Sequence, residues 1–418
     1  IVVTRDLAAQ LERRKERNCR NAATCGYFYK QNGTPYAFGE RLVQSDLAAT
    51  LELIADQGPD AFYKGAIAAK IVAEMEAGGG LIDRASLAAY KPVIRDAIRT
   101  NYRGYEVVTM PPPSSGGVHV LQMLNVLSHF PIAEMGRGSA DKLHVLAEVM
   151  RLAYADRSKH LGDPDFYDVP LEWLLSDEYA EELAGTIDMN RARPSAEVAP
   201  GVPPRHESED TTHFSVMDAE GNVVANTYTL NGSYGSAISV PGAGFLLNNE
   251  MEDFVSKPGT PNMFGLLGGE ANAVEALKRP LSSMTPVIVF SDGEPWFATG
   301  SPGGARIITA VLQMVVNMID HGMNIADASH RPRIHHQWFP DKLTIEVGFG
   351  SRGYDHGGHP GYDDYHYYGD GPFCDALDGY GAWRYVPSVG ATLWFPFGEI
   401  GWRPDEQRLD SADIAALD

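Results

Sequence analysis

A threonine at the junction between two kinds of sequence is the first candidate for chemistry. Residues 190–209 are rich in Pro, Arg and Glu and read as an exposed linker, whereas residues 212–217 are strand-like, and Thr211 stands between them. A threonine hydroxyl is a weak nucleophile unless a base lies beside it. One such base is the residue's own α-amine, freed when the chain is cut just before it and carrying a reference pKa near ~8. The simpler interpretation is that Thr211 is only a good strand residue.

A glycine-rich loop is the second candidate. The segment GSPGG at 300–304 follows a strand-like stretch and precedes a helical pattern over residues 305–319. A strand, a glycine loop and a helix start in this order aim free backbone N–H groups at an anion. The sequence therefore predicts an anion-stabilising loop here.

Other chemical signatures are absent or weak. The chain has no Gly-x-Ser-x-Gly nucleophile elbow and no phosphate-binding Walker loop. Residues 348–353 match a dinucleotide fingerprint only as a string, because no helix follows them. His335 and His336 are adjacent, and on a strand they would point to opposite faces. The His and Asp residues between 356 and 366 read as a solvated tail, so no metal site is predicted.

These groups need elements to hold them. Strands are predicted at 105–110, 212–217, 223–230, 286–290 and 295–299, with hairpin turns at 218–222 and 291–294. Amphipathic helices are predicted over 1–18, from a cap at Ser45 to Gly58, over 60–76, and around residues 143–152. Residues 350–418 show little helix or strand periodicity.

Composition limits the class of protein. The 418 residues carry a net charge of −21, which argues against nucleic acid and against an anionic membrane surface. No apolar run approaches the roughly 18 residues of a membrane span. The three cysteines are Cys19, Cys25 and Cys374. They read most simply as unrelated thiols; the alternative is a Cys19–Cys25 bridge, which would imply an oxidising compartment.

Several segments together resemble the γ-glutamyltransferase (glutathione hydrolase) family in order and spacing. They are MPPPSSGG at 110–117, YADR at 154–157, LGDP at 161–164, DTTH at 210–213, TYTLN at 227–231, LNNEMEDF at 247–254, RPLSSM at 279–284 and GSPGG at 300–304. The resemblance covers roughly residues 1–349. It implies an α+β fold of the N-terminal-nucleophile hydrolase type, a four-layer α-β-β-α sandwich.

The resemblance also implies a maturation step and a division of the chain. The precursor would cut itself between Asp210 and Thr211. Residues 1–210 would then be the large-subunit portion, mostly helical, residues 211–349 the β-rich catalytic portion of the small subunit, and residues 350–418 an atypical tail.

The site residues are carried over by the same resemblance. Thr211 would attack the γ-glutamyl amide carbonyl, Thr229 would hydrogen-bond the nucleophile, and Gly303 and Gly304 would donate N–H groups to the oxyanion. The residues that would bind the substrate head group are Asn231, Glu250, Asp253, Ser282 and Ser283. Phe264 would be the aromatic gate of a lid.

The function implied is transfer and hydrolysis of γ-glutamyl groups from glutathione and other γ-glutamyl amides, through an acyl-enzyme on Thr211. The acceptor would be water, an amino acid or a peptide, and no cofactor is needed. Two subunits would come from one precursor, and the protein would be periplasmic or secreted. The alternatives are a β-lactam or glutaryl acylase on the same scaffold, and a catalytically inactive remnant.

The chain departs from the family pattern at both ends, so the fold is expected to be incomplete there. The family's large subunit starts well before Ile1, and that earlier part carries an arginine for the substrate α-carboxylate. Beyond Phe349 the family's closing motifs are replaced by a stretch rich in Tyr, Gly, His, Asp and Trp. We hypothesise a change of reading frame or an assembly error near residues 348–352, which sequencing of the locus would test.

Overall fold

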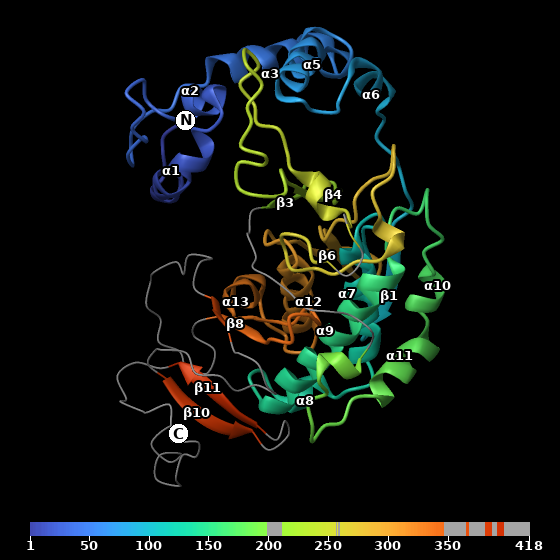
Figure 1. Cartoon of the computed structure of the whole chain (residues 1–418). Helices are drawn as coiled ribbons and strands as arrows, with labels where there is room; N and C mark the ends of the chain where they lie inside the picture. Colours follow the sequence, from blue (N-terminus) through green and yellow to red (C-terminus); the bar gives the residue numbers. More distant parts are fainter. Residues whose placement is uncertain are drawn as a thin grey trace. The chain divides into compact units, whose positions relative to one another are not determined.

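The computed structural model describes residues 1–198, 211–255, 257 and 260–346, together with the backbone of three strands at 365–367, 381–386 and 391–396 (Figure 1). The chain forms two compact units. Unit 1 contains residues 1–95 and 229–250, and unit 2 contains residues 96–228 and 251–418. Each unit therefore contains residues from both sides of the predicted cut, and the predicted division at residues 210 and 349 stays a prediction.

Unit 1 is helical. Its helices are α1 (Arg5–Asn18), α2 (Ala22–Phe28), α3 (Ser45–Gln57), α4 (Asp60–Tyr63), α5 (Ala66–Gly78) and α6 (Arg84–Ala89). The apolar faces of α4 and α5 pack with Val240 and Ala243 from the irregular segment 229–250 in one buried cluster. Burying these side chains supplies most of the stability that short helices lack alone.

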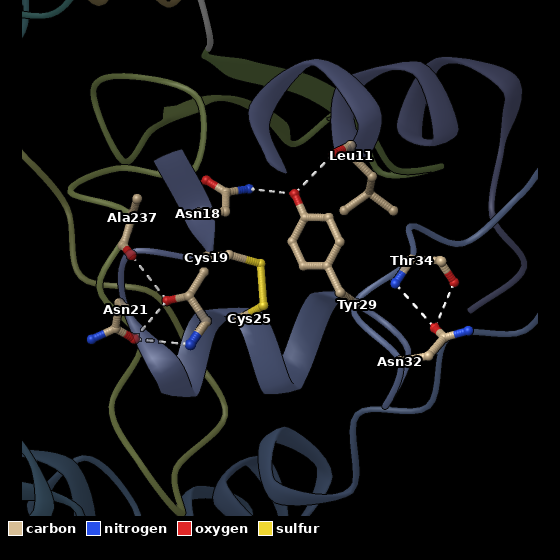
Figure 2. The surroundings of a disulfide bond; sticks show 10 residues. Leu11, Asn18, Cys19, Asn21, Cys25, Tyr29, Asn32, Thr34 and Ala237 are labelled. Atoms are coloured by element: carbon tan, nitrogen blue, oxygen red, sulfur yellow. Dashed lines mark hydrogen bonds between the residues drawn. A yellow bond between two sulfur atoms is a disulfide. The ribbon is translucent and has the colours of Figure 1, made fainter. Parts of the chain in front are cut away.

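A disulfide ties α1 to α2. Cys19 and Cys25 are bonded, so the interpretation of unrelated thiols is wrong and the bridged alternative is confirmed (Figure 2). Their helices are also joined through Tyr29, whose hydroxyl donates to the Leu11 carbonyl at 2.8 Å and accepts from Asn18 Nδ2 at 3.2 Å. The reason is local: Cys19 caps the end of α1 and Cys25 lies in the first turns of α2, so the short link between the helices keeps the two sulfurs close.

Unit 2 combines helices with antiparallel sheets, which confirms a mixed fold of the α+β kind. Its strands are β1 (Ile98–Tyr102), β2 (Tyr105–Thr109), β3 (Thr212–Met217), β4 (Val223–Tyr228), β5 (Val287–Ser291), β6 (Glu294–Thr299), β7 (Ile334–His335), β8 (Thr344–Glu346), β9 (Tyr365–Tyr367), β10 (Gly381–Val386) and β11 (Ala391–Pro396). The largest sheet has the order β1-β2-β5-β6, and β3-β4 is a separate hairpin. Both predicted hairpins and their turns are confirmed.

The helices of unit 2 are α7 (Ser115–Leu127), α8 (Ile132–Met135), α9 (Ala140–His160), α10 (Leu171–Leu174), α11 (Asp177–Gly185), α12 (Arg306–Ile319) and α13 (Ile325–His330), with short 3-10 turns η1 (Ser195–Glu197), η2 (Glu250–Asp253, at the unit boundary) and η3 (Glu270–Asn272). Helix α7 is buried along its whole length and contacts α9, α11 and α12. The core of unit 2 therefore forms around α7.

A buried polar network crosses this core. Gln122 on α7 donates to the Asp156 carboxylate on α9 at 2.6 Å, and the Tyr179 hydroxyl on α11 donates to the same oxygen at 2.8 Å. His119 Nδ1 lies 2.8 Å from Gln122 Oε1. Burial raises the pKa of Asp156 to about 6 and lowers that of His119 to about 3.

Two helix predictions are wrong in detail. Gln44, not Ser45, holds the N-cap position of α3, although Gly58 ends the helix as predicted. The single helix over residues 60–76 is broken into α4 and α5 at Gly65, where a Cβ would lie 3.0 Å from the Ala61 carbonyl oxygen. Such a close approach of the backbone to itself cannot be seen in hydrophobic periodicity.

The prediction of an exposed linker at 190–209 is also wrong for its first part. The first part of the 190–209 segment is not an exposed linker, because Ser195 is buried and its hydroxyl donates to the Asp341 carboxylate at 2.7 Å. The Trp338 indole N–H donates to the Ser195 carbonyl at 3.0 Å. Residues 199–209 lie outside the described part of the chain. Beyond residue 350 the chain forms β9, which pairs with β8, and the hairpin β10-β11.

Candidate active site

Thr211 lies immediately before β3, at the start of the β3-β4 hairpin. The first residue of β3, Thr212, pairs with the last residue of β4, Tyr228, and Thr229 comes next in the chain. His213 stiffens this end of the hairpin, because its Nδ1 lies 2.8 Å from the Thr227 hydroxyl. Asp210 lies outside the described residues.

The glycine loop follows β6 and leads into α12, as the sequence predicts. β6 contacts both β3 and β4. The approach is so close that a Cβ on Gly300 would lie 2.2 Å from His213 Nδ1, which requires a glycine at this position. Among the described residues, the N–H groups of Gly303 and Gly304 have no acceptor, while their carbonyls accept from Arg306 and Ile307. The loop therefore offers two donors on the same unit as Thr211.

Phe264 packs against this loop. A Cβ on Gly304 would lie 2.6 Å from the Phe264 ring, so ring and loop are in direct contact. The ring is buried, and its backbone is fixed on both sides: its N–H donates to Asn262 Oδ1 and its carbonyl accepts from Gln337 Nε2, each at 3.0 Å. The predicted lid aromatic therefore lies against Gly304 of the glycine loop.

Ser282 and Ser283 form a turn held by the segment before α7. The Ser282 N–H donates to the Pro113 carbonyl at 2.9 Å, and the Ser282 carbonyl accepts from the Ser115 N–H at 2.8 Å. The Ser282 hydroxyl accepts from the Met284 N–H at 3.0 Å. A Cβ on Gly116 would lie 2.0 Å from Thr285 Oγ1, which explains why glycine follows the serines in the motif at 110–117.

Asp253 is tied to the same turn through one buried amide. Asn272 Nδ2 donates to the Asp253 carbonyl at 2.7 Å, and Asn272 Oδ1 accepts from the Leu281 N–H at 3.0 Å. Leu281 precedes Ser282 in the chain. The predicted ammonium acceptor and the predicted serine pair are therefore brought together in unit 2.

Asn231 and Glu250, the remaining predicted head-group residues, belong to unit 1. Asn231 is buried with a φ of +73°, a left-handed conformation that Asn tolerates better than most residues. Its N–H donates to the Thr229 hydroxyl at 2.9 Å, and its Nδ2 donates to the Asn249 carbonyl at 3.2 Å. The Glu250 N–H donates to Asn248 Oδ1 at 2.9 Å at the start of η2.

Arg157, a residue without a role in the sequence-based prediction, lies at the serine turn. Its Nε donates to the Ser115 hydroxyl at 2.9 Å and its Nη2 to the Ser283 hydroxyl at 3.3 Å. The sequence held one signal for this residue: an arginine close to the apolar pattern of the predicted helix that corresponds to α9. Arginine is rarely buried unless its charge has a partner, so a buried arginine indicates a specific role.

His335 is the last residue of β7 and His336 lies just beyond the strand, and the two imidazoles contact different partners. His335 Nδ1 lies 2.8 Å from the Thr309 hydroxyl, whereas His336 Nε2 lies 3.3 Å from the Asp341 carboxylate. In the part of the chain that the structure describes, no group of three or more His, Cys, Asp or Glu side chains is placed to hold a metal ion. None of the described helices combines the length and apolarity of a membrane span. The dinucleotide-like string at 348–353 lies outside the described residues.

Comparison with known proteins gives consistent results. The chain is 56% identical over 322 residues to a glutathione hydrolase proenzyme of Escherichia coli, covering 77% of this chain and 55% of the relative. It is 44% identical over 303 residues to an acylase ACY 1 proenzyme of a Pseudomonas species, covering 72% of this chain and 52% of the relative. The chain thus spans about half the length of these curated relatives.

A solved structure and a family model also match the chain. The crystal structure of a cephalosporin acylase from Bacillus halodurans matches with a TM-score of 0.69 at 28% identity, over 80% of this chain and 59% of that chain. The sequence model of gamma-glutamyltranspeptidase matches residues 1–356. This chain, with a threonine leading its β3-β4 hairpin and a double-glycine donor loop beside it, belongs to the gamma-glutamyltranspeptidase family.

Proposed function

We propose that this chain is part of an enzyme that transfers and hydrolyses the γ-glutamyl group of glutathione and related amides. Thr211, released as an N-terminus by cleavage after Asp210, attacks the γ-carbonyl while its own α-amine takes the hydroxyl proton. The α-ammonium returns this proton to the leaving amine, which departs, and water or the amine of an amino acid or peptide then attacks the acyl-enzyme and regenerates the Thr211 hydroxyl. Thr229 hydrogen-bonds the nucleophile in this proposal.

The glycine loop suits the charged intermediate of this reaction. Negative charge builds on the carbonyl oxygen as Thr211 attacks, and preorganised N–H donors stabilise it by roughly 3 to 4 kcal/mol per donor. Gly303 and Gly304 hold two N–H groups without an acceptor among the described residues. We assign them to the oxyanion.

The observation that carries the choice of substrate is the serine turn. The Ser282 hydroxyl accepts from a backbone N–H and the Ser283 hydroxyl accepts from Arg157, so each has its own hydrogen left for an acceptor. A carboxylate is such an acceptor, and Asp253 beside the turn suits the ammonium on the same substrate carbon. Asn231 and Glu250 are assigned to the same head group.

The wider arrangement is proposed on family grounds. We propose a four-layer α-β-β-α sandwich, large and small subunits from one precursor, Phe264 as part of a lid, and a periplasmic or secreted location. The Cys19–Cys25 disulfide supports the location, because such bonds persist in oxidising compartments.

The second candidate is an acylase for glutaryl or β-lactam side chains, favoured by the acylase relatives. The two candidates share a nucleophile and differ in the α-ammonium of the acyl group. Turnover of γ-glutamyl-p-nitroanilide and of glutaryl-p-nitroanilide separates them. We expect at least a tenfold higher kcat/KM for the γ-glutamyl substrate, and a preference for the glutaryl substrate would select the acylase.

The nucleophile is tested by mass spectrometry of the full chain after expression. We expect two chains that meet between Asp210 and Thr211, and one uncut chain for Thr211→Ala. A wild-type chain that stays whole and inactive would support the remnant alternative instead.

A further inference from the structure

Arg157 is a buried cation with an unusual set of partners. It lies on α9 with only 4% of its surface exposed. It hydrogen-bonds the hydroxyls of Ser115 and Ser283, and among the described residues it forms no ion pair. Taking a guanidinium out of water without a paired anion costs free energy, and an isolated buried charge is rare. Burial lowers the pKa of Arg157, and the nearby Asp253 carboxylate partly opposes this. A guanidinium nonetheless stays charged in a protein.

The hydroxyl of Ser115 makes both of its hydrogen bonds within the protein. The Ser115 hydroxyl accepts from Arg157 and donates its hydrogen to the Ser282 carbonyl at 2.8 Å. It therefore acts as a fixed link between the guanidinium and the backbone of the serine turn. This link fixes the position of Arg157 relative to Ser282 and Ser283.

The hydroxyl of Ser283 can only accept from Arg157, so the direction of its own hydrogen is restricted. Arginine can only donate, so the Ser283 oxygen must accept from it and must turn its own hydrogen elsewhere. In the described part of the chain, that hydrogen has no acceptor. A positive charge behind an O–H group also makes it a stronger donor, because the developing negative charge on its oxygen is stabilised.

We propose that Arg157 is a positioning residue for substrate recognition: it orients the Ser283 hydroxyl as a donor to the substrate α-carboxylate and adds positive charge behind that bond. The inference rests on the proposed γ-glutamyl function and names a residue to which that function alone gave no role. Arg157 acts through Ser283 and does not contact substrate.

The test compares two anilides that differ only in the α-carboxylate. These are γ-glutamyl-p-nitroanilide and 4-aminobutanoyl-p-nitroanilide, assayed with the full chain as wild type and as Arg157→Gln. We expect the ratio of their kcat/KM values to fall about tenfold to one hundredfold in the variant, as for loss of a charge-assisted hydrogen bond. The loss should appear as a higher KM for the γ-glutamyl substrate, with the 4-aminobutanoyl substrate changed by less than about threefold.

A matched control lies at the other end of α7. Arg103 donates to the carbonyls of Leu127, Ser128 and Phe130 and pairs with Asp320, so Arg103→Gln also removes arginine hydrogen bonds at an end of α7, but none of them involves the serine turn. It should lower the melting temperature and leave the substrate ratio unchanged. If Arg157→Gln does not fold, Arg157→Lys keeps the charge but cannot bridge both serines with a planar fork, and a threefold to tenfold fall in the ratio is expected.

The outcomes separate the two proposals. A wild-type enzyme that does not turn over the γ-glutamyl anilide overturns the proposed function and this inference with it. A wild type that prefers the carboxylate-bearing substrate, with the same preference in Arg157→Gln or Arg157→Lys, overturns the inference alone. A ratio that falls in the Arg157 variants but not further when Ser283→Ala is added supports action through Ser283.

Discussion

Replacing Gly304 by alanine tests whether the glycine loop is shaped by contact with Phe264. The φ of Gly304 is +50°, and a non-glycine residue there costs about 1 to 2 kcal/mol. The new Cβ would also lie 2.6 Å from the Phe264 ring, whereas carbon atoms pack at about 3.5 Å. The ring would have to retreat by about 0.9 Å, the difference between these two distances.

The ring cannot retreat easily. Phe264 is 5% exposed, and its backbone is held by hydrogen bonds to Asn262 and Gln337. Overpacking of this kind costs about 1 to 3 kcal/mol. We therefore expect Gly304→Ala to lower the free energy of unfolding by about 2 to 5 kcal/mol, the sum of the backbone and packing terms, and to lower turnover by displacing the loop N–H groups.

Urea denaturation provides the measurement, and Gly322 the control. Gly322 follows the other end of α12 with a φ of +59° and nothing within 4 Å of a Cβ, so Gly322→Ala carries only the backbone cost of about 1 to 2 kcal/mol. In a Phe264→Ala background the extra cost of Gly304→Ala should largely disappear. Equal costs for the two glycine variants, or no relief in that background, would refute the reasoning.

Three further predictions concern stability. Cys19 and Cys25 are six residues apart, so loop-closure entropy predicts a loss of about 2 kcal/mol on reduction, read from urea denaturation with and without reductant; unchanged stability would contradict it. The folded pKa of Asp156, about 6, lies above its unfolded value of about 4, so the folded state binds more protons between these pH values and this contribution to stability is lost as pH rises. Relative to Asp156→Asn, the wild type should therefore lose up to about 3 kcal/mol between pH 4 and 7, and a flat difference between the two denaturation series would count against a buried carboxyl. Tyr102→Phe removes the hydroxyl that donates to Asp320 at 2.8 Å, and it should lower the free energy of unfolding by about 1 to 3 kcal/mol in thermal denaturation. An unchanged free energy of unfolding would show that this hydrogen bond does not stabilise the fold.

Local signals in the sequence located the elements that carry the candidate site. The turns at 218–222 and 291–294 and the strands beside them are confirmed, because turn residues and alternating strands act over a few residues. The strand, glycine loop and helix at 295–319 are confirmed for the same reason. The errors have a different origin: the break at Gly65 and the burial of Ser195 depend on partners that no local pattern contains.

By itself the sequence determined which residues could do chemistry. It identified a threonine at a strand start, a double-glycine loop and an adjacent pair of serines, since residue type and short-range spacing decide these. Only the tertiary structure decided that Ser115 and Arg157 fix the direction of the Ser283 hydroxyl, that Asn272 brings Asp253 to the serine turn, and that Phe264 lies against Gly304. These contacts join residues far apart in the chain, and hydrogen-bond direction and close packing exist only once the chain has brought such residues together.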